Sequence, residues 1–234
     1  MQLKRLIFII LAAMGCLFLF SGCEKKIWAH RVNSPEMANQ KIKYFPGIEV
    51  DLVFDKATGE LFVSHDIEGS NTKLTFRQYL QQVRKPGSIK YWLDVKNLQE
   101  NPDAICDTIL QLADYYEFAN RFFVESWDVW ALNIAKNKGI STSLWVENVY
   151  DFPEIDTLKW VEKVRKSIEY CHPDALSAHY RMRQLLNEYF PDIRINLWQT
   201  PAEFNDENVA ITREICRDPH VKVLLVDYDK PVSY

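Results

Sequence analysis

The sequence predicts one α/β domain, a closed (β/α)₈ or TIM barrel, and three observations lead to this prediction. The chain has 234 residues, of which 47% are hydrophobic and 26% charged, a balance typical of a single globular domain. From residue 27 onward, strand-like runs alternate with helical stretches, and such alternation indicates a parallel sheet. Eight strand-helix units in about 210 residues favour a closed barrel over an open doubly wound sheet.

The predicted strands are short and rich in β-branched or aromatic residues. In chain order they are Ile27–Arg31, Ile48–Phe54, Tyr91–Lys96, Phe122–Ser126, Ser141–Val146, Ala175–Ala178, Arg194–Trp198 and Val221–Asp227. An additional β-hairpin is predicted after the second strand, where the turn at residues 55–60 leads back into Leu61–His65.

The predicted helices follow the strands, and several begin with recognisable start signals. Asn101, Pro102 and Asp103, for example, supply an N-cap, a proline in the first turn and an acid facing the helix dipole. The helices are predicted at Pro35–Lys41, Thr75–Arg84, Pro102–Tyr116, Val129–Lys138, Asp156–Glu169, Met182–Tyr189 and Asp206–Arg217.

The first 22 residues have the pattern of an export signal. Lys4 and Arg5 precede an apolar run over residues 6–20, which is short for a membrane span of about 20 residues. The following Ser21-Gly22-Cys23 resembles the lipobox of bacterial lipoproteins, which implies cleavage before Cys23 and its acylation. We expect a signal peptide at 1–22, a lipidated Cys23 with a tether at 23–26, and the barrel at 27–234. A plain N-terminal membrane anchor is the alternative.

Either alternative exports the domain, and the lipoprotein pattern predicts a membrane-anchored protein in the periplasm or on the cell surface. The formal net charge of −4 argues against nucleic acid as a partner. No GxGxxG or GxxxxGK[ST] loop is present, which excludes the common nucleotide-phosphate loops. Cys106, Cys171 and Cys216 have neither a disulfide nor a zinc spacing, and we expect Cys106 and Cys216 to be buried in helices.

Functional groups in this fold lie at the carboxyl ends of the strands, and polar residues occur there on the first two strands. The first strand ends in His30 and Arg31, and the second carries Glu49 and Asp51 on one face. Two buried carboxylates repel each other unless a cation lies between them, and Mg²⁺ or Ca²⁺ prefers such oxygen ligands. The alternative is that one carboxylate faces the surface or pairs with Arg31.

The third strand and the hairpin extend this set. Asp94 and Lys96 share one face of the third strand, where Asp94 could be a third ligand and Lys96 a phosphate contact. The hairpin returns to His65, so that two imidazoles could act as general acid and base near neutral pH. Together with a Lewis-acidic metal, these groups suit cleavage of a phosphodiester.

These residues resemble the phosphatidylinositol-phospholipase-C-like superfamily of (β/α)₈ phosphodiesterases, which includes the glycerophosphodiester phosphodiesterases. The matching runs are Ala29-His30-Arg31, Ile48–Leu52, Val63–Asp66 and Leu93–Lys96. The resemblance implies that His30 and His65 are the acid and base, that Glu49, Asp51 and Asp94 bind the metal, and that Arg31, Asn33 and Lys96 bind substrate.

Details of the motifs point to particular branches of this superfamily. Glycerophosphodiesterases usually have Gly at the place of Val32 and Glu at that of Asp94. His30-x-x-Asn33, with Glu49-x-Asp51 and Asp94-x-Lys96, is similar to the sphingomyelinase D branch, and Trp28-Ala29-His30 to the menorin family. Further residues at strand ends that could line the pocket mouth are Glu125, Glu147, His179, Trp198 and Asp227.

We therefore expect a metal-dependent phosphoric diester hydrolase that uses one divalent cation, Mg²⁺ or Ca²⁺, on glycerophosphodiesters or lysophospholipids. A non-catalytic surface lipoprotein that binds a phosphorylated ligand in the barrel mouth is the alternative from another class. A different metal-dependent barrel hydrolase, with ligands from later strands, is a third. For Trp145 and Trp198 we expect core packing rather than contact with a ligand, given 13% aromatic residues in the chain.

Overall fold

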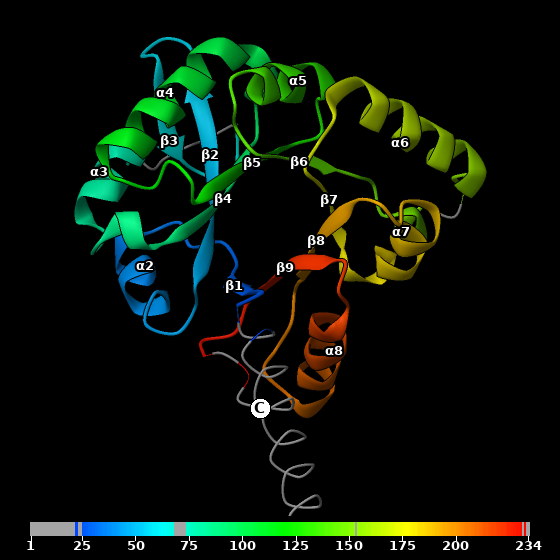
Figure 1. The fold of residues 1–234 in the computed structure, drawn as a ribbon. Coiled ribbons are helices and arrows are strands. Elements are labelled where there is room, and N and C mark those ends of the chain that lie inside the picture. Colours follow the sequence, from blue (N-terminus) through cyan, green and yellow to red (C-terminus); the bar gives the residue numbers. More distant parts are fainter. Residues whose placement is uncertain (1–21, 23–24, 68–73, 153, 231, 233–234) are drawn as a thin grey trace, which may run out of the picture.

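The computed structural model describes residues 22, 25–67, 74–152, 154–230 and 232, and these form a closed barrel with helices around it (Figure 1). The predicted signal peptide, apart from Gly22, and the predicted lipidated Cys23 lie outside the described residues. Within the described ranges, no helix combines the length and the apolar character that crossing a bilayer requires.

Eight parallel strands form the barrel wall, as the sequence predicts. Their order in the sheet is β1-β9-β8-β7-β6-β5-β4-β2, and pairing of β1 with β2 closes the ring. The ring strands are β1 (Ile27–Ala29), β2 (Gly47–Asp55), β4 (Lys90–Val95), β5 (Phe122–Ser126), β6 (Thr142–Trp145), β7 (Ala175–His179), β8 (Arg194–Gln199) and β9 (Val221–Val226).

The predicted extra hairpin is also confirmed. Strand β3 (Glu60–Val63) pairs antiparallel with the last part of β2 and lies outside the ring. The antiparallel partners run from Leu52 opposite Val63 to Asp55 opposite Glu60. Strand β3 therefore ends opposite Leu52, the last residue of β2 that pairs with β4, and this brings the segment after β3 to the carboxyl end of the ring.

Six of the seven helices that the described residues form around the barrel begin at a side chain that accepts a hydrogen bond from the first turn, whereas α7 follows Met182 without such a cap. Asn101 caps α4 as predicted, and Thr75 forms a capping box with Gln78 at α3. The helices are α2 (Pro35–Lys41), α3 (Phe76–Gln82), α4 (Pro102–Tyr115), α5 (Val129–Asn137), α6 (Thr157–Cys171), α7 (Arg183–Tyr189) and α8 (Asp206–Arg217).

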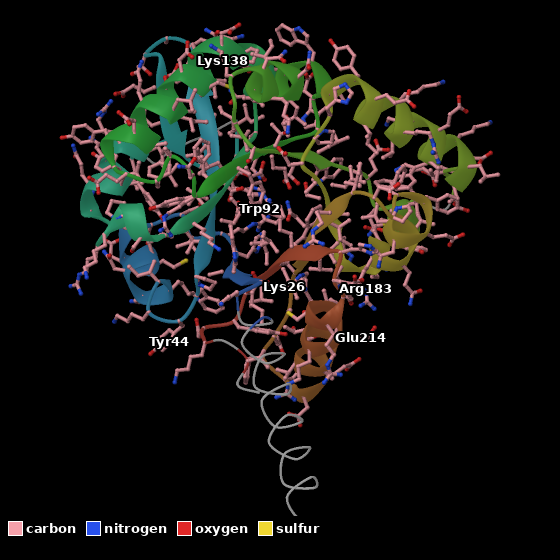
Figure 2. The ribbon with its side chains drawn as sticks, in the orientation of Figure 1. Lys26, Tyr44, Trp92, Lys138, Arg183 and Glu214 are labelled. Atoms are coloured by element: carbon pink, nitrogen blue, oxygen red, sulfur yellow. The ribbon has the colours of Figure 1, made fainter. Side chains whose placement is uncertain are left out.

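Two apolar regions hold the barrel together. The larger one fills the space between the strands and the helices, and it includes the buried Cys106 and Cys216. The smaller one fills the barrel itself with Trp28, Trp92, Phe123, Val223 and Leu225. Figure 2 shows Trp92 among the strands near the middle of the molecule.

Gly47 makes room for this inner packing. A Cβ atom at residue 47 would lie 2.3 Å from the Trp28 ring, closer than real contacts allow. Glycine at this position therefore leaves room for the indole of Trp28, which packs inside the barrel. The polar site lies on top of this apolar plug, toward the carboxyl ends of the strands.

Candidate active site

Three carboxylates from two neighbouring strands meet inside the barrel. Asp51 on β2 is the register partner of Asp94 on β4, and Glu49 lies two residues earlier on the same face of β2. One ligand oxygen from each of the three lies within 4.8 Å of the others. Glu49 and Asp51 are 2% and 1% exposed, so the alternative of a surface-facing carboxylate is wrong.

Lys96 and Asn33 surround Asp51. The Lys96 ammonium lies 2.6 Å from Asp51 Oδ1 and 2.5 Å from Asp94 Oδ2. The Asn33 amide donates to Asp51 Oδ2 at 2.7 Å, and its carbonyl oxygen accepts from the Asp51 backbone N–H at 3.0 Å. Burial raises the pKa of Asp51, but Lys96 and Asn33 outweigh burial, and the net pKa of this carboxyl is lowered.

The pKa values of Glu49 and Glu125 are raised, because both carboxyls are buried and Lys96 alone cannot balance the negative charge that all these carboxyls would carry when ionised. Burial and repulsion from Asp51 and Asp94 hold the pKa of Glu49 well above its ordinary value. Burial and the charge of Asp94 do the same to the pKa of Glu125, the register partner of Asp94 on β5. Hard oxygen donors with excess negative charge are the environment that Mg²⁺ or Ca²⁺ prefers, so the residues fit a divalent cation.

His30 is held by a carboxylate from the last strand. Its Nδ1 lies 2.8 Å from Oδ1 of Asp227, the residue after β9, and Asp227 Oδ2 accepts from the Ala202 backbone N–H at 3.2 Å. Burial raises the pKa of Asp227, but the contact with His30 and the Ala202 N–H outweigh it, and this pKa is lowered. Because Nδ1 is engaged, Nε2 is the ring nitrogen of His30 that remains available to a ligand in the pocket.

His65 is positioned at both ring nitrogens. Nδ1 lies 2.9 Å from Asp66 Oδ1, and Nε2 lies 2.9 Å from Arg31 Nη2. A guanidinium group can only donate, so Nε2 accepts and Nδ1 carries the proton that Asp66 receives in a hydrogen bond. The two contacts therefore fix the orientation of the His65 ring, with Nε2 directed toward Arg31.

Arg31, which follows β1, contacts Glu49 on β2 and His65 after β3, and its backbone conformation is unusual. Its φ of 49° lies in the left-handed region, which residues other than glycine adopt uncommonly. The backbone N–H of Arg31 donates to Glu49 Oε2 at 2.5 Å while its side chain reaches His65. Arg31 thus contacts Glu49 through its backbone, whereas the sequence left open an ion pair through its guanidinium.

One cavity of about 140 Å³ brings most of the predicted site residues together. Asn33 is the exception, because it lies behind Asp51 and supports it. The residues that line this catalytic pocket are His30, Arg31, Glu49, Asp51, His65, Trp92, Asp94, Lys96, Glu125, Trp145, Trp198, Thr200 and Leu225.

The remaining candidates divide into those near the pocket and those away from it. Trp198 and Glu125 line it, whereas Glu147 pairs with Lys163 at 3.2 Å and lies outside its lining. His179 likewise lies outside the lining, where it accepts a hydrogen bond from Arg181 at 3.4 Å.

Sequence reasoning assigned no role to Asp66 and Thr200 and the wrong one to Trp145. Trp145 is 37% exposed at the pocket rim, so the core packing expected for it is wrong. Asp66 directly follows His65 in the chain, and this adjacency was the available signal for its role.

No protein-family model and no curated protein matches the sequence. Among solved structures, the fold is similar to a glycerophosphodiester phosphodiesterase from Parabacteroides distasonis. The TM-score is 0.61 at 17% identity, and the match covers 87% of this chain and 93% of that one. A glycerophosphodiester phosphodiesterase from Agrobacterium tumefaciens matches with a TM-score of 0.57 at 15% identity, covering 88% of this chain and 96% of that one.

The same barrel also resembles proteins with other chemistry, such as a 2,3-dimethylmalate lyase with a TM-score of 0.50 at 11% identity, covering 93% of this chain and 81% of that one. At such identities the likeness concerns the backbone, and function has to be argued from the site. The described chain therefore has the TIM-barrel fold of the glycerophosphodiester phosphodiesterases.

Proposed function

We propose that this protein is a metal-dependent phosphodiesterase that acts on glycerophosphodiesters or lysophospholipids. The observation that carries the proposal is the catalytic pocket. It contains two histidines, each hydrogen-bonded to a carboxylate, together with three clustered carboxylates. The fold shared with glycerophosphodiester phosphodiesterases supports it.

In this proposal Glu49, Asp51 and Asp94 hold one divalent cation, Mg²⁺ or Ca²⁺. When bound, such an ion neutralises a non-bridging phosphate oxygen and withdraws electron density from phosphorus. The Arg31 guanidinium and the Lys96 ammonium line the same pocket and supply donors for the other phosphate oxygens. Asn33 holds Asp51 in place from behind.

The two histidines carry the proton transfers. One imidazole takes the proton of the attacking hydroxyl, which belongs to water or to the substrate, as the new P–O bond forms. The other gives a proton to the leaving oxygen as the old P–O bond breaks. Asp227 and Asp66 orient the two rings, and a carboxylate at Nδ1 stabilises each imidazolium when it forms. His65 becomes available once Arg31 moves from its Nε2 to the phosphate.

The location of the protein is a second part of the proposal. We infer that residues 1–22 are removed as a signal peptide and that acylated Cys23 anchors the barrel to a membrane, in the periplasm or at the cell surface. The basic residues, the short apolar run and Ser21-Gly22-Cys23 support this inference. Labelling with a radioactive fatty acid tests it, because Cys23→Ser removes the label if the inference is correct and retains it otherwise.

The activity is tested with the mature chain, residues 23–234, carrying Cys23→Ser so that no acyl group is attached. Phosphorus NMR follows glycerophosphocholine and lysophosphatidylcholine with Mg²⁺, Ca²⁺ or chelator. We expect metal-dependent turnover that falls by about 10² or more in His30→Ala and in His65→Ala. His172→Asn is the matched control, because His172 is exposed and has a φ of 44°, which asparagine tolerates.

Turnover that persists in chelator, or in both histidine variants, would contradict the mechanism. Binding of both phosphodiesters without turnover of either would instead favour the non-catalytic binding protein. A cyclic phosphate among the products would identify the substrate's own hydroxyl as the attacking group.

A further inference from the structure

A second and larger cavity lies next to the catalytic pocket, between the end of β6 and the helices α5 and α6. It measures about 570 Å³, against about 140 Å³ for the catalytic pocket. A further cavity of about 480 Å³ adjoins it along α6. The two cavities share Val129, Lys163 and Ser167, and we call them together the α5–α6 groove.

The inner walls of the groove are apolar. The residues that form them are at most 5% exposed, so they are the packed floor of the groove. These wall residues are Leu144, Val146, Trp160 and Val164. At the rim, Trp127 is 58% exposed, which adds a large apolar side chain that faces water. Exposed apolar surface of this kind is costly unless a ligand covers it.

Trp145 connects the groove to the catalytic pocket. Among the described residues, Trp145 is the one that the two linings share, so the cavities meet at this residue. Trp145 is the last residue of β6, at the carboxyl end of the barrel where Lys96 and His65 also lie. A ligand whose phosphate lies against Lys96 would have to pass Trp145 to reach the groove.

The two cavities differ in chemistry in the way that an amphipathic ligand requires. The catalytic pocket is lined by four carboxyl groups, two histidines, an arginine and a lysine, and it suits a phosphate. In the larger cavity of the groove, the charged Glu147 and Lys163 pair with each other at 3.2 Å. The outer cavity along α6 also carries Lys159, Glu162 and Lys166, so the apolar walls available to a hydrocarbon belong to the larger cavity.

We propose that the α5–α6 groove binds the acyl chain of a single-chain phosphodiester lipid whose phosphate occupies the catalytic pocket. This assignment rests on the phosphodiesterase activity proposed above and selects lysophospholipids over glycerophosphodiesters that lack a chain. Each methylene group transferred from water to the groove increases affinity by about fourfold. The gain continues with chain length until the groove is filled and then stops.

The test uses two tryptophan substitutions on α6. Ser167 lies in the groove and is partly exposed, so Ser167→Trp places an indole in the path of the chain. Glu169 is exposed on the same helix and lines neither part of the groove, so Glu169→Trp is the matched control. Both are made in the mature chain with Cys23→Ser, and thermal unfolding verifies that each variant is folded.

Calorimetry in chelator, where no turnover is expected, measures the binding of octanoyl, decanoyl and dodecanoyl lysophosphatidylcholine below their micelle concentrations. We expect the dissociation constant to fall by about tenfold or more for each two carbons added. Ser167→Trp loses most of this gain, whereas Glu169→Trp retains it. Dissociation constants that do not depend on chain length, or equal losses in both variants, overturn the assignment.

A separate measurement distinguishes failure of the groove from failure of the activity. Turnover of glycerophosphocholine, which has no chain, reports on the catalytic pocket alone. Turnover together with binding that does not depend on chain length would overturn the groove assignment and support the proposed activity. Binding that depends on chain length, without turnover of any substrate, would support the groove assignment and overturn the proposed activity. If the chain effect occurs only with phosphatidylcholine vesicles, and not with dispersed lipid, the exposed tryptophans contact a membrane surface and the groove assignment is wrong.

Discussion

We expect Glu49→Gln to stabilise the metal-free protein and to remove its response to divalent cations. Glutamine has nearly the shape of glutamate, and its amide oxygen can still accept the hydrogen bond from the Arg31 backbone N–H. What the substitution removes is a buried ionisable group beside Asp51 and Asp94. The sign of the effect is therefore opposite to that of most substitutions at buried sites.

Two estimates give the size of this stabilisation. Unit charges at most 4.8 Å apart repel by at least about 3.5 kcal/mol at an effective dielectric constant of about 20. Glu49 has two such neighbours, and Lys96 offsets about one of them. Keeping the carboxyl protonated above its ordinary pKa of 4.5 costs about 1.4 kcal/mol per pH unit, at most about 3.4 kcal/mol at pH 7. We therefore expect about 2–3 kcal/mol.

The dependence on pH provides the sharpest check. Folding raises the pKa of Glu49, so parent and variant are equally stable below about pH 4.5, where this carboxyl is protonated in both folded and unfolded chains. The advantage of the variant grows as pH rises from there toward the folded pKa. At pH 7 and in chelator, we expect its Tm to be about 4–12 °C higher.

Thermal unfolding of parent and variant from pH 4 to pH 8, with chelator and with Mg²⁺ or Ca²⁺, measures both effects. Saturating metal, at about a hundredfold its Kd, stabilises the parent by about 2.7 kcal/mol and the variant by much less. Glu188→Gln is the control, because Glu188 is exposed on α7. A variant less stable than the parent in chelator at pH 7, or a difference that does not change with pH, would refute the reasoning.

Three further substitutions test other parts of the structure. Asp227→Asn leaves His30 without its carboxylate, so we expect kcat to fall by about 10² with little change in KM; an unchanged kcat contradicts this role. Lys96→Met leaves two buried carboxylates unbalanced, and urea unfolding should show a loss of about 3 kcal/mol that added metal partly restores. Gly47→Ala forces a methyl group against Trp28, and we expect a loss of about 1–3 kcal/mol in the same assay, which an unchanged midpoint would disprove.

The parts of the site that follow from strand order were predictable from the sequence. The carboxyl ends of parallel strands meet at one end of a barrel, so Glu49, Asp51 and Asp94 had to converge if the alternation of strands and helices was interpreted correctly. Strand parity placed Glu49 and Asp51 on one face, because side chains alternate along a strand. The barrel and the carboxylate cluster were therefore predictable because each strand is recognised from a local pattern and the fold then brings the strand ends together.

The parts that depend on closure of the ring or on side-chain packing were not predictable. Asp227 contacts His30 across 197 positions of the chain, and no local pattern indicates this pairing. The left-handed backbone of Arg31 has no signal in its residue type. Trp145 was assigned to the core because its residue type is usually buried, whereas its exposure results from the hollow between α5 and α6.

The contact between His30 and Asp227 also bears on the biogenesis of the protein. Strands β1 and β9 are neighbours in the ring, although they are the first and the last of the described strands in chain order. Forming this pair closes a loop of nearly the whole described barrel, and contacts so distant in sequence form slowly. A nascent chain that lacks β9 has every carboxylate of the cluster but cannot orient His30. The complete site is therefore assembled only after β9 has been synthesised, so a chain truncated before β9 would lack it.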